Sequence, residues 1–406
     1  GAAGGAVRAF GHLLVCWLAA LAWLAVPAAH AADPGKVLHM VFEVAEQGFD
    51  PVRISDNYSA TINEAIFERL LTYDYLARPA KLVPLVAEAM PQVTDNGRVY
   101  TFRLRKGIFY TPDPAFKGKP RELVAGDFAY VIKRHADPKN RSPWAFMVEG
   151  KIEGLDALVA QAKKTGKFDY DAKIPGLETP DPHTLVVRLV APDYLFNYTV
   201  AHVPYGAMAR EVVEAYGDDI GAHPVGTGPY VLAEWKRASR IVLEANPAYR
   251  GFTWDFAPSA DEWDRQLVRD MRGKSMPQIG RVEISIIEED QSRWLAFGGK
   301  ELDVLALPGT FRPQAIGADG DLLPRWSGEG VKLYKAIDPD ITYTIFNFRD
   351  PVVGGFEPEA KPWVAPDQIP HPFEFQLLEE DWEHFEILMD SAVHRLPVLA
   401  ETGIRK

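Results

Sequence analysis

The pattern of hydrophobic and polar residues predicts short strands spread along most of the chain. Residues 37–44 are mainly apolar and indicate an opening strand, which the sequence Gly48-Phe49-Asp50-Pro51 ends. Farther along, apolar and polar residues alternate in several segments, as they do in strands with one buried face. Strands are therefore predicted at residues 100–104, 184–190, 230–235, 240–245, 281–287, 301–305 and 341–348.

A helical pattern extends from Tyr58 to Leu71, where apolar residues recur at intervals of three and four. Asp56 or Ser59 can cap the start of this helix, because both side chains accept hydrogen bonds from free backbone amides. The same spacing predicts that four polar residues point outward: Asn63, Glu64, Glu68 and Arg69.

Two more helices are predicted, at residues 123–135 and 294–297, and residues 94–97 (Thr-Asp-Asn-Gly) have the composition of a hairpin turn. Residues 137–180 are rich in Lys, Gly and Asp, and we expect a looser segment there. Strands and helices are mixed without a regular βαβ rhythm. This arrangement favours a mixed α/β (α+β) body over a simple doubly wound sheet.

The first residues have the composition of a secretory signal peptide. An arginine precedes an uncharged apolar run from Leu13 to Val26, and the small residues that follow suit cleavage near Ala31. A membrane anchor is the alternative, but the run has about 14 residues whereas a spanning helix needs about 20. We therefore expect residues 1–31 to be removed on export to the periplasm, together with the single cysteine, Cys16.

Charge and motifs argue against nucleic-acid binding and against catalysis. The 406 residues carry a net charge of -12, whereas a nucleic-acid binder needs a basic face. Gly273-Lys274-Ser275 lacks the upstream glycine of a P-loop, and the sequence contains no Gly-x-Gly-x-x-Gly fingerprint. His384 and His394 do not have the spacing of zinc ligands. We therefore expect no cofactor, no metal, no catalytic residue and no enzymatic activity.

Seven short segments carry more information together than any one of them carries alone. They are residues 82–88 (Leu-Val-Pro-Leu-Val-Ala-Glu), 95–97 (Asp-Asn-Gly), 100–107, 124–134, 223–232 (His-Pro-Val-Gly-Thr-Gly-Pro-Tyr-Val-Leu), 246–251 (Asn-Pro-Ala-Tyr-Arg-Gly) and 299–304. In their order and spacing they resemble the family 5 extracellular solute-binding proteins of oligopeptide and dipeptide ABC importers. The resemblance covers about residues 37–355.

The resemblance implies a bilobed periplasmic-binding-protein fold, in which two lobes on a hinge close over a solute. Residues 32–270 would form the first lobe with its inserted subdomain, and residues 271–355 the start of a second, incomplete lobe. The implied function is capture of a peptide or similar small solute and its delivery to an ABC permease in the inner membrane. We expect a monomer that binds no nucleic acid.

A solute cleft needs aromatic walls and a few fixed polar groups. Gly226, Gly228 and Pro229 suit a tight backbone path beneath such a cleft, because glycine tolerates positive φ and proline fixes φ. Each aromatic candidate taken singly has burial in the core as its alternative. The candidate ligand-binding residues are Phe49, Asn57, Tyr58, Tyr230, Trp294, Tyr343 and Asn347.

Residues 356–406 do not continue this pattern. They resemble an internal piece of the FAD-dependent sarcosine and dimethylglycine dehydrogenases, and Val-Val-Gly-Gly at residues 352–355 suits both families. Apolar residues between Trp382 and Leu396 recur at three and four positions, which predicts one amphipathic helix. Two alternatives to a working binding protein are therefore a fragment of such a dehydrogenase and a chimeric, truncated product without function.

Overall fold

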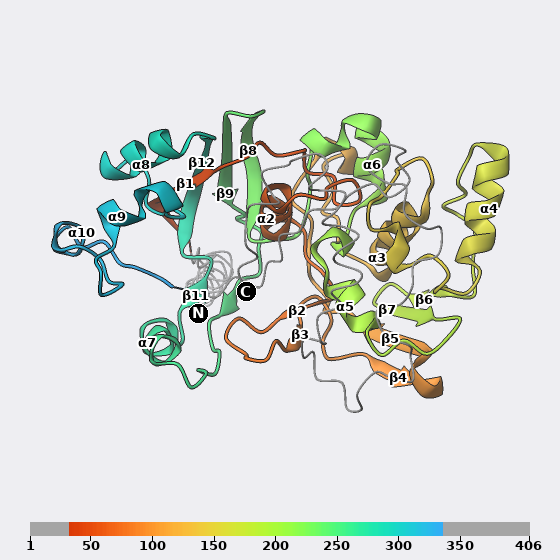
Figure 1. Cartoon of the computed structure of the whole chain (residues 1–406). Coiled ribbons are helices and arrows are strands. Elements are labelled where there is room, and N and C mark those ends of the chain that lie inside the picture. Colours follow the sequence, from red (N-terminus) through yellow and green to blue (C-terminus); the bar gives the residue numbers. More distant parts are fainter. Residues whose placement is uncertain (1–31, 336–406) are drawn as a thin grey trace, which may run out of the picture. The chain divides into compact units, whose positions relative to one another are not determined.

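The computed structural model describes residues 32–335 (Figure 1). Contacts divide the chain into two units, residues 1–324 and 325–406. The short helix α10 (Pro324–Gly328) begins at this division. Residues 32–324 are the described part of the first unit.

The N-terminal strand β1 (Asp33–Phe42) lies at the edge of a four-stranded sheet with the order β1-β12-β9-β8 (Figure 1). β1 pairs in parallel with β12 (Ile279–Ile286), although the two strands are far apart in sequence. β12 also pairs antiparallel with β9 (Arg240–Ala245), which forms a hairpin with β8 (Tyr230–Lys236). The parallel pairing places the carboxyl ends of β1 and β12 at the same edge, and the chain leads from β1 into helix α2 (Asn57–Ile66).

A second sheet contains four antiparallel strands in the order β4-β5-β7-β6. Its strands are β4 (Gln92–Thr94), β5 (Val99–Arg103), β7 (Thr184–Arg188) and β6 (Leu177–Asp181). Helix α3 (Ala125–Ala136) packs against β6 and β7. Nine of the twelve residues of α3 are buried, and they include the polar Asp127, Arg134 and His135 as well as apolar residues.

Two short strand pairs and several helices complete the described chain. The strand pairs are β2 (Leu71–Tyr73) with β3 (Leu82–Pro84), and β10 (Phe252–Thr253) with β11 (Ser275–Met276). The α-helices are α4 (Leu155–Thr165), α5 (Phe196–Ala201), α6 (Arg210–Tyr216), α7 (Glu262–Met271), α8 (Asp290–Gly298) and α9 (Arg312–Ala315). The 3-10 helices are η1 (Asp95–Gly97), η2 (Pro114–Phe116), η3 (Ala145–Met147), η4 (Val203–Tyr205), η5 (Gly217–Ala222) and η6 (Gly309–Phe311).

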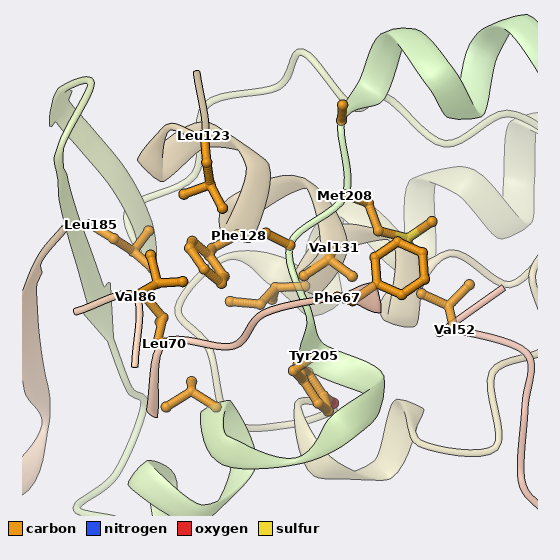
Figure 2. Close-up of a cluster of buried hydrophobic side chains, with 14 of the residues drawn as sticks. Val52, Phe67, Leu70, Val86, Leu123, Phe128, Val131, Leu185, Tyr205 and Met208 are labelled. Atoms are coloured by element: carbon orange, nitrogen blue, oxygen red, sulfur yellow. The ribbon is translucent and has the colours of Figure 1, made fainter. Parts of the chain in front are cut away.

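A large hydrophobic cluster joins α3 to the chain around it (Figure 2). Phe128 and Val131 of α3 lie at the centre of the view, with Leu185 of β7 on one side and Phe67 and Met208 on the other. All five side chains are buried. Burial of each large apolar side chain contributes roughly 1.5–3 kcal/mol, so this cluster fixes α3 and the segment that follows α2.

Most of the strand predictions are confirmed. Residues 100–104, 184–190, 230–235, 240–245 and 281–287 correspond to β5, β7, β8, β9 and β12, with small differences at the ends. The predicted turn at residues 94–97 joins β4 to β5, with Asp95 and Asn96 at positive φ. The predicted helices at 123–135 and 294–297 correspond to α3 and α8.

Two strand predictions have other outcomes. The strand at 301–305 is wrong, because this segment forms no ladder. It is joined to β1 by hydrogen bonds of the Asp303 amide and carboxylate to the backbone of His39. The strand at 341–348 lies outside the described residues, as does the helix expected in the tail.

The helix predicted at 58–71 begins as expected but ends early. α2 ends at Ile66, and Phe67 is extended with φ -106° and ψ 128°. The following residues form β2, whose pairing with β3 replaces the helical hydrogen bonds. Of the four residues predicted to point outward, Glu64 is exposed, whereas the prediction is wrong for the buried Asn63, Glu68 and Arg69.

The segment 137–180 is more regular than predicted. It contains helix α4 and the start of β6. Gly154 and Gly166, both at positive φ, flank the helix, and its apolar residues Leu158 and Ala162 are buried. Glycine at these ends is the usual signal for a helix boundary, and it was obscured here by the many lysines of the segment.

The glycines of the 223–229 segment are needed for a reason other than the one predicted. Gly226 and Gly228 do not have positive φ, so the expected backbone freedom is wrong as an explanation. A Cβ atom on Gly226 would instead overlap the carbonyl oxygen of Ile66, and one on Gly228 would lie 2.5 Å from the carbonyl oxygen of Ala65. Close approach to the end of α2 therefore requires both glycines.

Candidate functional site

A cavity of about 330 Å³ lies where the start of α2 meets the chain around η4. Its walls come from the start of α2, the chain just after α2, Trp144 and the chain around η4, and they bring polar and aromatic side chains together. The lining residues are Ile54, Ser55, Asp56, Asn57, Ala60, Glu64, Arg69, Tyr73, Trp144, Ala201, His202, Val203 and Pro204. A concave site with a few convergent polar groups is the usual form of a small-molecule site.

Asp56 caps α2 at one wall of the cavity. Its backbone is extended, and its Oδ1 accepts a hydrogen bond of 2.7 Å from the amide of Ser59. Ser59 is held in turn, because its Oγ accepts a hydrogen bond from the amide of Gln47. The second oxygen of Asp56, Oδ2, is buried and has no partner among residues 32–335.

Arg69 lines the cavity with a buried guanidinium, and its residue is only 4% exposed. Nη2 donates to Oε1 of Glu64 at 2.8 Å and to Oγ1 of Thr72 at 2.9 Å. Nε and Nη1 are buried without an acceptor in the described part of the chain. A buried donor without a partner costs free energy, because it has lost the water that it would bind in the unfolded chain.

Trp144 and His202 form an aromatic wall, with ring centroids 4.4 Å apart. The indole Nε1 of Trp144 donates a 2.7 Å hydrogen bond to the carbonyl oxygen of Ile54, which fixes the ring against the α2 side of the cavity. Burial lowers the pKa of His202, and the nearby charge of Arg69 lowers it further. The imidazole is therefore neutral near pH 7, and its buried Nδ1 has no partner among the described residues.

Larger cavities exist in the structure, but they have fewer such groups. A cavity of about 840 Å³ lies beside the β2–β3 connection, and a second of about 810 Å³ lies beside β10 and β11. The first has one buried polar atom without a partner among the described residues, on Asn197, and the second has none. Three such side chains, Asp56, Arg69 and His202, line the smaller cavity, which we therefore take as the candidate site.

Within residues 32–335, each helix is too short or too polar to span a lipid bilayer. The same part of the chain holds no group of three or more His, Cys, Asp or Glu side chains that could bind a metal ion.

The sequence model of the bacterial extracellular solute-binding proteins, family 5, middle region, matches residues 81–362. This match covers more than half of the chain. The chain belongs to family 5. The resemblance seen in the sequence is thereby confirmed over most of its length, while the likeness of residues 356–406 to a dehydrogenase stays a prediction.

Curated relatives of this family 5 chain include two peptide-binding proteins. The periplasmic oligopeptide-binding protein OppA of Salmonella typhimurium is 31% identical over 214 residues, which are 52% of this chain and 35% of OppA. Di/tripeptide-binding protein 2 of Pseudomonas aeruginosa is 27% identical over 248 residues, which are 58% of this chain and 42% of that protein. The chain thus matches less than half the length of each relative.

Solved structures show the same fold. The substrate-binding domain of an oligopeptide ABC transporter from Bacillus anthracis superposes with a TM-score of 0.54 and 22% identity, over 68% of this chain and 46% of that one. This likeness confirms the predicted fold class, a mixed α/β fold of the kind found in periplasmic binding proteins.

The structure places only some of the residues predicted to bind the solute at this cavity. Asn57 lines the cavity, and the neighbouring Tyr58 packs against Phe42 with ring centroids 4.9 Å apart. Phe49 is fully buried against Trp235, so it supports the fold rather than lining this cavity.

Tyr230 lies at the start of β8, and its hydroxyl donates to the carbonyl oxygen of Ile279 at the start of β12. Trp294 is 9% exposed and stacks on Phe311, with ring centroids 5.5 Å apart. Neither residue lines the cavity. Tyr343 and Asn347 lie outside the described residues, so their role stays a prediction.

Sequence reasoning missed three of the residues that shape the cavity: Arg69, Trp144 and His202. The early end of α2 turns Arg69 inward, and no local pattern predicts that. Trp144 and His202 come from irregular segments and meet only in the folded chain. The sequence offered one signal for these two residues: they are a tryptophan and a histidine in loops, and loops supply many binding residues.

His135 of α3 holds two walls of the cavity together. Its Nε2 lies 2.9 Å from the carbonyl oxygen of Pro204, beside His202, and its Nδ1 lies 2.7 Å from Oγ of Ser142, near Trp144. A carbonyl oxygen only accepts, so Nε2 carries the proton and Nδ1 accepts from the serine hydroxyl. Burial lowers the pKa of His135 to about 4.

Acid should therefore weaken the fold through His135. A pKa below the unfolded value of 6.5 gives stability that is complete above pH 6.5 and is lost as the pH falls toward 4. The expected loss is roughly 3 kcal/mol in the free energy of unfolding. Urea unfolding of the wild type and His135→Gln at pH 7, 5.5 and 4 measures it. The wild type should lose its advantage over the variant in acid, and parallel pH profiles would contradict this role.

Proposed function

We propose that the chain is the solute-binding component of an ABC importer, which captures a peptide or similar small solute and delivers it to an inner-membrane permease. The observation that carries this proposal is the family 5 match over residues 81–362. The names of the two relatives, an oligopeptide-binding and a di/tripeptide-binding protein, support peptide as the solute class.

The chemistry of the cavity supports the capture of a peptide. A peptide offers an ammonium group, amide donors and acceptors, and side chains of mixed polarity. Asp56 and Arg69 place opposite charges in the cavity wall, which suits the ammonium group and the oxygen acceptors of a peptide. Trp144 and His202 give a flat surface against which a side chain could pack.

The other expectations from the sequence belong to the same proposal. Residues 1–31 would direct export to the periplasm, residues 32–270 would form the first lobe, and residues 271–355 would begin the second. The protein would act as a monomer and without catalysis. A flavin absorbance in the purified protein would favour the dehydrogenase alternative instead.

Peptide binding should raise the thermal stability of the protein, because a solute that binds only the native state stabilises it by mass action. We expect a reproducible increase in Tm with one or more members of a di- and tripeptide library, and none with sugars. Trp144→Ala should weaken the binding by about tenfold or more, since an aromatic anchor in a pocket contributes strongly.

Trp263→Ala is the matched control for this experiment. Trp263 is a 47% exposed tryptophan on α7 that does not line the cavity, so its removal should leave peptide affinity unchanged. A cooperative melt that no peptide shifts would contradict the proposed function. A shift that Trp144→Ala does not reduce would place the peptide elsewhere.

A further inference from the structure

The turn between β4 and β5 carries Asn96 followed by Gly97 at its tip. Asn96 is exposed and has φ 52° and ψ 42°, a left-handed conformation that asparagine adopts more readily than most residues. This is the one Asn-Gly pair in the 406 residues. Asparagine loses its side-chain amide most readily before glycine, because glycine has no Cβ atom to hinder attack by its own backbone nitrogen.

The loss of the amide is an intramolecular reaction that needs only water. The backbone nitrogen of Gly97 gives up its proton and attacks Cγ of Asn96. The Cγ–Nδ2 bond then breaks, and the leaving nitrogen takes up a proton and departs as ammonia. Water adds to one of the two carbonyl carbons of the resulting five-membered imide and breaks the bond of that carbon to nitrogen. The product is aspartate or isoaspartate, and nothing is oxidised or reduced.

The folded turn blocks this attack. At a ψ of 42° the nitrogen of Gly97 lies on the far side of the Cα–C bond from the Asn96 side chain, so ψ must rotate before the two groups can meet. Main-chain hydrogen bonds to a neighbouring segment resist that rotation. The carbonyl oxygen of Gly97 accepts from the amide of Asp193 at 3.2 Å. The carbonyl oxygen of Arg98 accepts from the amide of Leu189 at 2.8 Å.

Tyr194 restrains the reacting groups themselves. Its hydroxyl donates to Oδ1 of Asn96 at 2.9 Å and lies 3.3 Å from the backbone carbonyl oxygen of the same residue. Its ring covers Gly97, because a Cβ atom added there would lie 2.9 Å from a ring carbon. Tyr194 is 66% exposed, so this restraint depends on a surface side chain and not on the core.

We propose that Asn96 is a modification site, where spontaneous deamidation gives aspartate or isoaspartate, and that the Tyr194 hydroxyl limits its rate. The reaction proceeds from the locally opened turn, so its rate follows the population of that open state. The new carboxylate lacks a free cation beside it, because Arg98 already pairs with Asp95 at 3.5 Å and with Glu153 at 2.9 Å. This site is independent of the proposed solute binding.

Peptide mapping of the full chain during incubation at pH 8 measures the reaction. The tryptic peptide of residues 82–98 contains no asparagine other than Asn96, so its conversion reports on this site alone. Tyr194→Phe removes the hydroxyl and keeps the ring over Gly97. We expect it to speed conversion about fivefold, the effect of losing one net hydrogen bond from the closed turn.

Tyr75→Phe is the matched control. Tyr75 is 63% exposed, and its ring packs near Trp254 and Phe256 instead of the turn, so this variant should convert at the wild-type rate. In concentrated urea, where the turn is absent, all three proteins should convert at one common, faster rate. Urea unfolding at pH 8 shows in addition whether Tyr194→Phe alters the stability of the whole fold.

Three outcomes would overturn the proposal. One is equal conversion of the wild type and Tyr194→Phe in the folded state. Another is the absence of conversion at Asn96 in both folded proteins while the urea-unfolded chains convert. The third is faster conversion in Tyr194→Phe with an equal loss of global stability, which would place the effect in the fold as a whole.

Discussion

Asp50→Asn is expected to lower the free energy of unfolding by roughly 3 to 5 kcal/mol, the usual cost of removing one partner from a buried ion pair. Arg134 of α3 donates to both carboxylate oxygens of Asp50, at 2.9 and 3.0 Å, and both side chains are buried. Asparagine keeps the shape of the side chain but leaves the guanidinium charge without a counter-charge. The pair also pins the segment between β1 and α2 to α3, so the site should suffer with the fold.

Urea unfolding at pH 7 measures this loss, with Asp218→Asn as the control. Asp218 is 79% exposed and pairs with Arg53 at 3.4 Å and Lys139 at 3.9 Å, and surface pairs of this kind contribute at most about 1 kcal/mol. Equal effects of the two substitutions would contradict a structural role for the Asp50–Arg134 pair.

Gly226→Ala should destabilise the protein by about 3 kcal/mol or more, because the added methyl group would overlap the carbonyl oxygen of Ile66. Neither side can move easily. The amide of Gly228 donates to that same oxygen at 2.8 Å, and the carbonyl oxygen of Gly226 accepts from the amide of Thr111 at 3.0 Å. The backbone of this segment is thus fixed on both sides of the clash.

Gly309→Ala is a matched control, since no atom lies within 4 Å of a Cβ added there and its φ is not in the left-handed region. Thermal unfolding of the two variants should show a large decrease in Tm for Gly226→Ala and little change for Gly309→Ala. Similar Tm values for both would mean that the α2 end can shift to make room, and the proposed reason for the glycine would be wrong.

Local sequence patterns predicted those elements that are determined by residues close together in the sequence. Asp56, one of the two residues predicted to cap α2, and the strands β8 and β9 follow from side-chain capping and from alternation, which neighbouring residues determine. The end of α2 does not follow from local patterns, because the chain after it forms β2, and β2 forms only by pairing with β3. Likewise, the parallel pairing of β1 with β12 depends on strands that are distant in sequence, and periodicity contains no information about it.

The candidate site was less predictable than the fold for a related reason. Asn57 was found because it follows the capping residue of a recognisable helix. Arg69, Trp144 and His202 converge from separate segments, and their value lies in unpaired donors and ring contacts that exist only after folding. Aromatic candidates such as Phe49 instead fill the core, which is the commoner fate of a large apolar side chain.

Hydrogen–deuterium exchange with and without a saturating peptide from the binding screen tests the central claim most directly, namely that this cavity holds the solute. Binding there should slow exchange in the four segments that line the cavity: residues 54–64, 69–73, 144 and 201–204. Unchanged exchange in these segments, with protection confined to residues 74–82 beside the larger cavity, would contradict it.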